Sequence, residues 1–565
     1  MLFVLTLFAG RLVQLQGLDS SVLASQALEK RTMRVVLPAH RGDITDASGA
    51  VLATTVERRD VLVDQTLVAR YKRHVGEDLV PVGLRGAAED LGGLLGVPVP
   101  EMVQRLTGRS LGAVVAKGVS PEVARRVMRL AVPGVATTQA SRRVYPAGTT
   151  AANVLGFLGT DRALGGIEQK YDALLSGTPG SVSYERGADG AQIPTGVASE
   201  TDPVPGSSVR LTLVRDLQWK AQELMTAQVK ATKAEAGFAV ALDVRTGEVL
   251  ALASVPTFDP NAPSRARPEA FSDRSLLDVF EPGSTAKVAT MAAALEEGAV
   301  TPRTRMTIPP SLHRSDATFR DAEVHGTEKL TLAGVLAQSS NIGTILAGEK
   351  ISPETLHRYL RAFGLGESTG IGLAESPGIL APPDQWSGSQ RYTVMFGQGL
   401  SVNALQAAGV FATVANDGVR VPPRVVAGRT DPQGVFHPEP APPSRRVVSA
   451  ATARDLRLMM ENVVGEDGTA AKAAIPGYRV AGKTGTAYHA DGKGGYNGYT
   501  SSFIGLAPAD APRIVVAVVL QKPTRGHYGG EVAAPVFQQL MTYALAERRV
   551  PPTGTPAPAL PLRWR

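Results

Sequence analysis

Two groups of short apolar runs, far apart in the sequence, limit the folds open to this chain of 565 residues. The first group, 238–243 and 249–253, flanks a turn at Arg245-Thr246-Gly247 and has the pattern of a β-hairpin. The second group has three runs in close succession, and short connections imply antiparallel strands. These runs cover 478–488, 501–507 and 513–521, and a helical pattern follows at 532–548. Because the stretch between the groups is rich in helical patterns, the sequence predicts one α+β domain over 208–549, an antiparallel sheet flanked by helices.

The first third of the chain has a different texture. Residues 17–207 alternate short β-like runs with short helical patterns, and we find no catalytic constellation in them. The clearest helix begins at Ser120, a favoured N-cap, and ends at Pro133-Gly134. We therefore expect a mixed β/α pedestal domain without catalytic residues. At the other end, residues 550–565 are rich in proline, which cannot continue a helix, and a flexible tail is expected.

The first residues of the sequence are apolar. Residues 2–9 form an apolar run that stops at Arg11, about half of the roughly 20 residues that a helix needs to span a bilayer. We interpret residues 1–16 as a truncated membrane anchor whose first half lies upstream of the start used here. A buried N-terminal helix is the alternative that so short a run leaves open.

Composition excludes several classes of function. The chain has no cysteine, which removes disulfides, thiolate nucleophiles and cysteine-based metal sites. Its 8 histidines are scattered without a metal-binding spacing, so we do not expect a histidine metal site. The net charge of +7 is spread thinly, with no basic block, and a nucleic-acid partner is not indicated.

A serine and a lysine three residues apart form the first candidate for catalysis. Ser284 and Lys287 lie at the start of a helical pattern that ends at Gly298. This spacing puts both side chains on one face, where a lysine amine with a lowered pKa can take the serine proton. The helix start also offers backbone N–H groups to a developing oxyanion. Since roughly one such pair is expected by chance, the motif is weak alone.

A Ser-x-Asn triplet occurs twice, at Ser339-Ser340-Asn341 and at Ser401-Val402-Asn403. In such a triplet the serine hydroxyl can relay a proton while the asparagine amide holds a substrate amide. Either triplet can equally be a helix cap or a turn, which serine and asparagine both favour. The residues alone do not choose between them.

A third motif, Gly482 to Thr486, lies on a strand-like run. A glycine inside a strand allows a ligand backbone to approach closely. Lys483, with the hydroxyls of Thr484 and Thr486, suits a carboxylate, and the Thr486 N–H is a candidate second oxyanion donor. The three motifs together are expected by chance in only a few chains per hundred, even before their order is considered, so they point to serine acyl-transfer chemistry.

Taken in this order, the motifs resemble those of penicillin-binding proteins and class A β-lactamases. Flanking segments narrow the resemblance to class B penicillin-binding proteins over nearly the whole chain. These segments are 41–46, 143–146, 166–168, 243–248 and 528–530. In that family the first third is a non-catalytic pedestal and dimerisation domain, and the rest is a DD-transpeptidase domain. Asn341 is similar to the division-type members, which implies septal peptidoglycan synthesis.

The resemblance also implies roles for individual residues. It assigns catalysis to Ser284, Lys287, Ser339, Asn341 and Lys483, and substrate binding to Thr484, Gly485 and Thr486. The family's second motif lies some way upstream of a Gly-Gln-Gly segment. Here residues 397–399 directly precede Ser401, which favours Ser339 as the catalytic serine. The expected reaction crosslinks stem peptides through a serine acyl-enzyme formed on D-Ala-D-Ala, without a cofactor.

The same resemblance implies partners and a location. We expect stem peptides and β-lactams as ligands, a membrane glycosyltransferase and division proteins as partners, and one membrane helix that holds the catalytic domain outside the cytoplasm. Three alternatives stay open: a serine β-lactamase, a β-lactam-binding sensor and a catalytically silent division scaffold.

Overall fold

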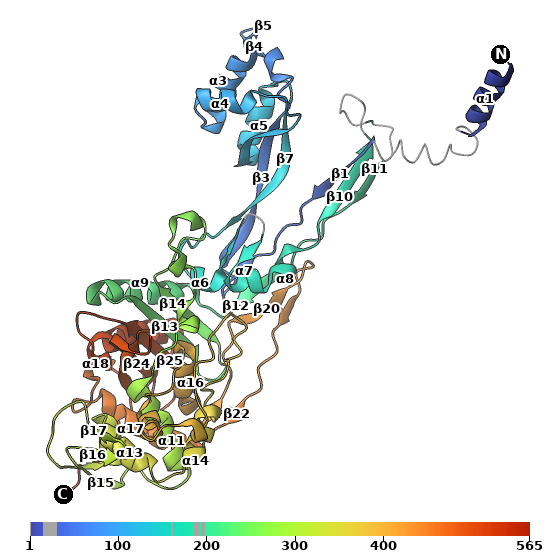
Figure 1. Cartoon of the computed structure of the whole chain (residues 1–565). Helices are drawn as coiled ribbons and strands as arrows, with labels where there is room; N and C mark the ends of the chain where they lie inside the picture. Colours follow the sequence, from blue (N-terminus) through green and yellow to red (C-terminus); the bar gives the residue numbers. More distant parts are fainter. Residues whose placement is uncertain (1, 15–30, 160–161, 186–192, 194–197) are drawn as a thin grey trace.

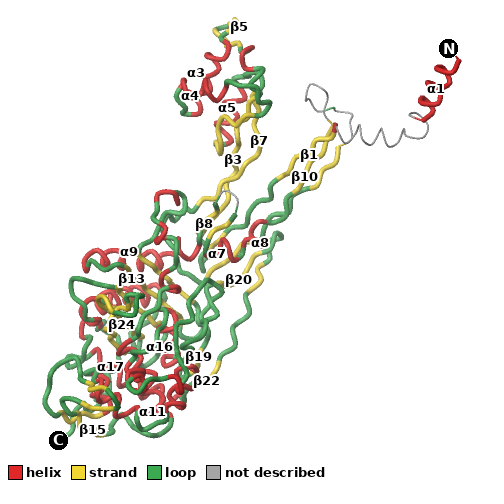
Figure 2. Tube along the Cα trace, in the orientation of Figure 1, coloured by secondary structure: helices red, strands yellow, loops and turns green. Residues whose placement is uncertain are grey.

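The computed structural model describes residues 2–14, 31–159, 162–185, 193 and 198–565. A large α+β domain forms one end of the molecule, and a small head of helices and strands lies at the other end of a long β-ribbon (Figure 1). Helices gather in these two parts, whereas strands and loops dominate the stalk between them (Figure 2). The expected division into a mixed pedestal and an α+β domain is confirmed.

A five-stranded antiparallel sheet forms the centre of the large domain. Its order is β14-β13-β25-β24-β23, so the two predicted strand groups pair through β13 and β25 and β23 is an edge strand. Every residue of the three strands β13, β14 and β25 is buried, because helices cover both faces of the sheet. The five strands are β13 (Ala236–Asp243), β14 (Val249–Val255), β23 (Ala481–Ala490), β24 (Tyr496–Ala507) and β25 (Ile514–Gln521).

Two pairs of helices cover this sheet. One pair packs on β13, β14, β24 and β25, and the other pair packs on the opposite face and on β23. The first pair is α9 (Arg215–Thr232) and α19 (Ala534–Glu547), and the second is α16 (Ala404–Ala415) and α17 (Ala450–Val464). Three further helices complete the core beside the second pair, namely α11 (Lys287–Glu296), α12 (Leu332–Ala337) and α13 (Asn341–Gly348). These last three helices position the candidate catalytic residues.

The pedestal is a second, mixed sheet. Its long strands β3 and β7 pair antiparallel, and Arg41 and Arg143 bind the fully buried Glu168 beside them at 2.6 and 2.7 Å. Strand β12 pairs with β2 on one side and with β20, from the transpeptidase region, on the other, so the two domains share a sheet. The strands are β2 (Ile44–Thr45), β3 (Val51–Val63), β6 (Ala113–Val119), β7 (Val135–Val144), β12 (Ser208–Leu211), β20 (Val426–Thr430) and β21 (Phe436–Pro438).

The head has its own hydrophobic core. The predicted helix start at Ser120 is found there, where its side chain accepts a hydrogen bond from the Val123 N–H at 3.2 Å. The elements of the head are β4 (Lys72–Val75), β5 (Asp78–Pro81), α3 (Gly83–Leu95), α4 (Val99–Leu106) and α5 (Pro121–Arg129).

The remaining helices and strands are short. The helices are α1 (Leu2–Val13), α6 (Ala152–Leu155), α7 (Gly166–Lys170), α8 (Asp172–Ser176), α10 (Arg274–Leu277), α14 (Pro353–Ala362), α15 (Gln390–Thr393) and α18 (Gly529–Val532). The strands are β1 (Thr32–Leu37), β8 (Phe157–Leu158), β9 (Ala163–Leu164), β10 (Gly180–Glu185), β11 (Ala198–Thr201), β15 (Arg305–Ile308), β16 (Leu312–Arg314), β17 (Ala317–Phe319), β18 (Glu328–Thr331), β19 (Val419–Arg420) and β22 (Arg445–Arg446).

The sequence predicts a membrane anchor at one end of the chain and a flexible tail at the other. Among the described residues, no helix combines the length and the apolar character needed to cross a membrane, and α1 has 12 residues. The anchor at residues 1–16 stays a prediction, and residues 15–16 lie outside the described part. The flexibility of residues 550–565 also stays a prediction, although residues 562–564 bind the antiparallel pair of strands β15 and β18.

Candidate active site

All three motifs meet at one open cleft beside the edge strand β23. The cleft has a volume of about 920 Å³, and its walls come from the start of α11, the α12–α13 connection, strand β23 and the loop 318–328. The predicted residues that line it directly are Ser284, Ser339, Asn341, Thr484 and Thr486. Lys287 and Lys483 lie just behind this surface, both fully buried.

Ser284 lies on a tight turn at the N-terminal end of α11. A 3₁₀ turn over Gly283–Ala286 precedes the helix, and Gly283 has a positive φ of 53° that favours glycine. The Gly283 N–H donates to the Gly397 carbonyl at 2.9 Å, and a Cβ on Gly397 would lie 2.1 Å from the Gly283 carbonyl oxygen. The Gly-Gln-Gly segment therefore holds the turn that presents Ser284 to the cleft.

Lys287 is a fully buried amine that, within the described part of the chain, forms no ion pair with a carboxylate. Its Nζ donates to the Ser339 carbonyl at 2.5 Å and approaches Ser339 Oγ at 3.3 Å. Burial lowers the pKa of Lys287 to about 7, and the charge of Asp321 opposes this shift. A lysine with this pKa is largely neutral just above pH 7, so it can accept a proton from a neighbouring hydroxyl.

Ser339 lies between the two buried lysines. It has a positive φ of 63°, which is uncommon for serine and re-aims the chain between α12 and α13. Lys483 Nζ donates to Ser339 Oγ at 2.9 Å, so one hydroxyl contacts both amines. Burial, and then the nearby charge of Lys287, lowers the pKa of Lys483 well below its usual value. Two ammonium groups would repel each other here, which favours the neutral form of one amine. Because Ser339 Oγ contacts both amines, the three groups form a path along which a proton can move.

The two asparagines of the Ser-x-Asn triplets occupy different environments. Asn341 begins α13 at the cleft, and its Nδ2 donates to the Arg320 carbonyl at 3.2 Å. Asn403 is fully buried and forms a capping box with Gln406 at the start of α16. The structure thus brings Asn341, and not Asn403, to the cleft, and the helix-cap reading applies to the second triplet.

Strand β23 is pressed against the nucleophile turn. A Cβ on Gly485 would lie 2.3 Å from Ser502 Oγ and 2.9 Å from the Pro282 carbonyl oxygen, so only glycine fits. Thr484 Oγ1 accepts a hydrogen bond from Lys483 Nζ at 3.1 Å, and Thr486 Oγ1 accepts one from the Gly529 N–H at 3.2 Å. The strand therefore presents two oriented hydroxyls to the cleft.

Sequence reasoning missed Asp321, whose carboxylate holds the start of α13. Asp321 accepts hydrogen bonds from Ser340 Oγ at 2.6 Å and from the N–H groups of Asn341 and Ile342 at 2.5 and 2.9 Å. A carboxylate at a helix N-terminus is stabilised by these free N–H groups. Asp321 is 19 residues before Ser340, and no spacing in the sequence connects them.

Asp321 offers a prediction about pH. Its charge raises the pKa of the buried Lys287, so Asp321→Asn should lower that pKa and move the acid limb of the penicillin acylation rate below its expected wild-type midpoint near pH 7. The measurement is the rate of penicillin acylation, followed by stopped-flow fluorescence over the range from about pH 5 to about pH 9.

His325 supplies the control for this prediction. Its Nε2 lies 3.1 Å from Asp321 Oδ2, and although burial opposes the shift, a hydrogen bond to Gly326 and the charge of Asp321 raise its pKa. His325→Gln should leave the limb in place. A limb that disappears in His325→Gln, or that stays at the wild-type pH in Asp321→Asn, would contradict the assignment to Lys287.

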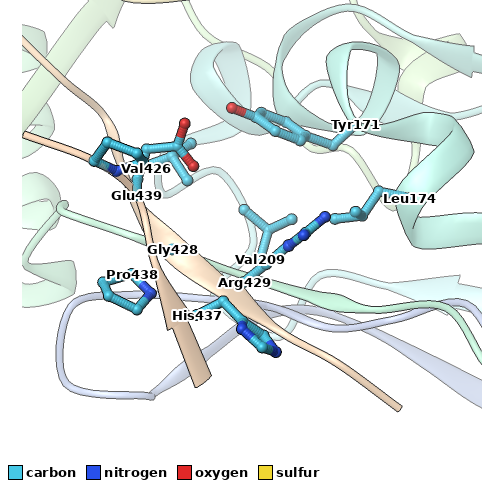
Figure 3. Close-up of a pocket in the computed structure, with 10 residues that line it drawn as sticks. Tyr171, Leu174, Val209, Val426, Gly428, Arg429, His437, Pro438 and Glu439 are labelled. Atoms are coloured by element: carbon cyan, nitrogen blue, oxygen red, sulfur yellow. The ribbon is translucent and has the colours of Figure 1, made fainter. Parts of the chain in front are cut away.

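A second cavity lies at the junction of the pedestal and the transpeptidase region, with a volume of about 340 Å³ (Figure 3). No predicted site residue lines it. Burial, and then the charge of Glu439, raises the pKa of Tyr171 there. Its labelled polar residues are Tyr171, Arg429, His437 and Glu439, and the described residues that line it include no serine, threonine or lysine. The chemistry therefore belongs to the first cleft.

Comparison with known proteins agrees with this geometry. The model of the penicillin-binding protein transpeptidase domain matches residues 237–542, and that of the penicillin-binding protein dimerisation domain matches residues 36–211. The fold and the cleft thus define a serine acyltransferase domain of the penicillin-binding type behind a dimerisation domain. The chain belongs to the class B penicillin-binding proteins.

Individual relatives cover nearly the whole chain. It is 36% identical to penicillin-binding protein PbpB of Mycolicibacterium smegmatis, over 100% of this chain and 91% of that protein. It is 33% identical to the peptidoglycan D,D-transpeptidase FtsI of Escherichia coli, over 98% of this chain and 91% of FtsI. The crystal structure of penicillin-binding protein 3 of Mycobacterium tuberculosis with aztreonam superimposes with a TM-score of 0.72 at 32% identity, over 94% of this chain and 100% of that one.

Proposed function

We propose that this protein is a peptidoglycan D,D-transpeptidase that crosslinks stem peptides during septal cell-wall synthesis. The observation that carries the proposal is the Ser339 hydroxyl, which contacts the amines of both buried lysines, Lys287 and Lys483, in the cleft that Ser284 lines. FtsI of Escherichia coli is named for this activity, and penicillin-binding protein 3 of Mycobacterium tuberculosis binds aztreonam. We therefore also propose that β-lactams acylate this protein.

The donor peptide would bind beside β23. An edge strand has unpaired N–H and C=O groups, to which an extended peptide can add as a further strand. In this pose the hydroxyls of Thr484 and Thr486, with the positive field of Lys483, would hold the terminal carboxylate of D-Ala-D-Ala. Asn341, on the facing wall, would bind the donor amide.

The acylation step moves one proton and one acyl group. Lys287 would accept the Ser284 hydroxyl proton as Oγ attacks the penultimate carbonyl carbon, and the N–H groups of Ser284 and Thr486 would stabilise the resulting oxyanion. When the tetrahedral intermediate collapses, the C–N bond breaks, and the proton passes through Ser339 to the leaving D-alanine.

The second half-reaction regenerates the enzyme. The amine of a neighbouring stem peptide attacks the acyl carbonyl and gives a proton to the lysine–serine network. The network returns a proton to Ser284 Oγ as the bond between Oγ and the acyl carbon breaks. The product is an amide crosslink. Lys287, Ser339 and Lys483 pass both protons, one to the leaving D-alanine and one back to Ser284. The reaction therefore needs no cofactor.

The location and partners are proposed on the same basis. Because peptidoglycan lies outside the cytoplasmic membrane, the catalytic domain would act there, held by a single membrane anchor to which α1 contributes. Septal synthesis also requires newly polymerised glycan, so we propose a membrane glycosyltransferase and other division proteins as partners.

The domain boundaries are part of the proposal. We divide the chain into 1–16, 17–207, 208–549 and 550–565. The boundary at 207/208 lies at the start of β12, which pairs with the pedestal strand β2 and with β20. A shared strand at the boundary would couple movement of the pedestal to the catalytic domain.

The proposed function is tested by the lifetime of a penicillin adduct. A transpeptidase should be labelled by a fluorescent penicillin and should keep the label for hours after excess drug is removed, because its acyl-enzyme is released by the amine of an acceptor peptide, which the assay does not contain. Labelling is followed by gel fluorescence. Loss of the label within minutes would indicate a β-lactamase instead, and absence of labelling would indicate a silent scaffold.

A further inference from the structure

Residues 560–565, here called the strap, cross the N-terminal end of α12. The Leu562 carbonyl accepts a hydrogen bond from the Thr331 N–H at 3.0 Å, and the Pro561 carbonyl accepts one from Thr331 Oγ1 at 2.6 Å. Thr331 is also the N-cap of α12, where its Oγ1 accepts from the Gly334 N–H at 3.1 Å. The strap is therefore tied to the helix whose other end leads into Ser339.

Trp564 fixes the far side of the strap. Its indole Nε1 donates to the Met306 carbonyl at 3.1 Å, and its backbone N–H donates to the Lys329 carbonyl at 3.2 Å. The cations of Lys329 and Arg305 lie 5.0 and 5.6 Å from the ring centre. An aromatic anchor with two backbone hydrogen bonds determines which way the neighbouring residue points.

The crossing is close enough to require glycine in α12. A Cβ on Gly334 would lie 2.0 Å from the Leu562 carbonyl oxygen, so a larger residue would push the strap away. Glycine is a poorer helix former than alanine, and here the close packing of the strap explains its presence in α12. The strap is thus part of the packed structure around the cleft.

Arg563 lies between the two fixed points of the strap. It forms a β-bridge with Leu330 and is one of the residues that line the cleft containing Ser284. One N–H donates to Glu328 Oε1 at 2.9 Å, and 59% of the side chain is exposed. We propose that Arg563 is a substrate-binding residue, which binds a carboxylate of the donor stem peptide other than the terminal one.

The choice of a carboxylate follows from the hydrogen-bond donors of Arg563 and from the charged residues that line the cleft. A guanidinium has five N–H donors in a fork that matches a carboxylate, and Glu328 uses only one edge of it. Arg320 is a second cation that lines the cleft, whereas the carboxylates of Glu323 and Asp467, which also line it, repel an anion near them. A peptide carboxylate is therefore accepted at one place, which would fix the register of the peptide in the cleft.

This inference rests on the proposed transpeptidase function, and its test uses two substrates. Two synthetic pentapeptides that end in D-Ala-D-Ala would differ only in one side-chain carboxyl, free in the first and amidated in the second. The release of D-alanine gives kcat and KM for the full chain, for Arg563→Ala and for Arg563→Lys. Arg565→Ala, a change of the same type on the strap, is the matched control, and penicillin acylation is measured for every variant.

Arg563→Ala should raise KM about tenfold for the free carboxylate and hardly at all for the amide, with kcat and penicillin acylation unchanged. Arg563→Lys should recover part of the difference, and Arg565→Ala should behave as the unmodified chain. Equal effects on both peptides, or a joint loss of penicillin acylation, would overturn the inference and leave the strap a purely structural element. Absence of penicillin acylation in the unmodified chain would instead refute the proposed function.

Discussion

Replacing Ser284 with alanine is expected to abolish covalent labelling by penicillin and to leave the fold intact. Ser284 lines the cleft, and the turn on which it lies is held by close contact between Gly283 and Gly397. The turn therefore does not depend on the Ser284 hydroxyl. The change in the free energy of unfolding should stay within about 1 kcal/mol, as for other small substitutions of partly exposed residues. Gel fluorescence with a labelled penicillin and a thermal melt measure both quantities.

Ser401→Ala is the matched control, because Ser401 belongs to the competing Ser-x-Asn triplet. Among the described residues its buried Oγ has no hydrogen-bond partner, so its removal should change neither labelling nor stability by much. Labelling that survives in Ser284→Ala would show that another residue carries the acyl group.

Lys287→Arg should slow acylation by about a hundredfold or more. Arginine keeps the positive charge but does not give up its proton near neutral pH, so it cannot act as the base for Ser284. The buried position of Lys287, where burial lowers the pKa to about 7, is what makes a lysine suitable for this task. Acylation rates at several drug concentrations give the comparison.

Because the site of Lys287 is fully buried, a bulkier guanidinium can also disturb packing. Lys287→Met, which has similar volume and no proton to exchange, should show the same loss of acylation with a native melting temperature. Lys472→Arg, at an exposed position, should be unaffected. Near wild-type acylation in Lys287→Met would point to a different base.

Much of the fold could be predicted because short local sequence patterns determine where its strands and helices lie. The strands that became β13 and β25 are continuous apolar runs, and such runs are typical of a sheet buried on both faces. The turn before α11 and the glycine of β23 also appear as short motifs, since tight backbone approaches leave few residue choices. The placement of Ser284 at the cleft with Lys287 buried just behind it agrees with a spacing of three residues at a helix start.

The features that sequence reasoning missed are long-range contacts without local pattern. Asp321 accepts a hydrogen bond from Ser340, which lies 19 residues further along the chain. The strap contacts Thr331 through the Pro561 carbonyl, although Thr331 and Pro561 are 230 residues apart. Proline-rich composition predicts a chain that cannot be helical, but it does not say where a non-helical chain packs. The addition of β20 to the pedestal sheet is of the same kind.

The central claim is that Ser284 forms an acyl-enzyme with a D-Ala-D-Ala peptide. It is tested most directly by acid-quenching the protein with such a peptide, digesting it and locating the adduct by mass spectrometry. The proposed mechanism predicts one adduct, the mass of the donor less its terminal D-alanine, on the fragment that contains Ser284. An adduct on any other residue, or release of D-alanine without an adduct on Ser284, would contradict it.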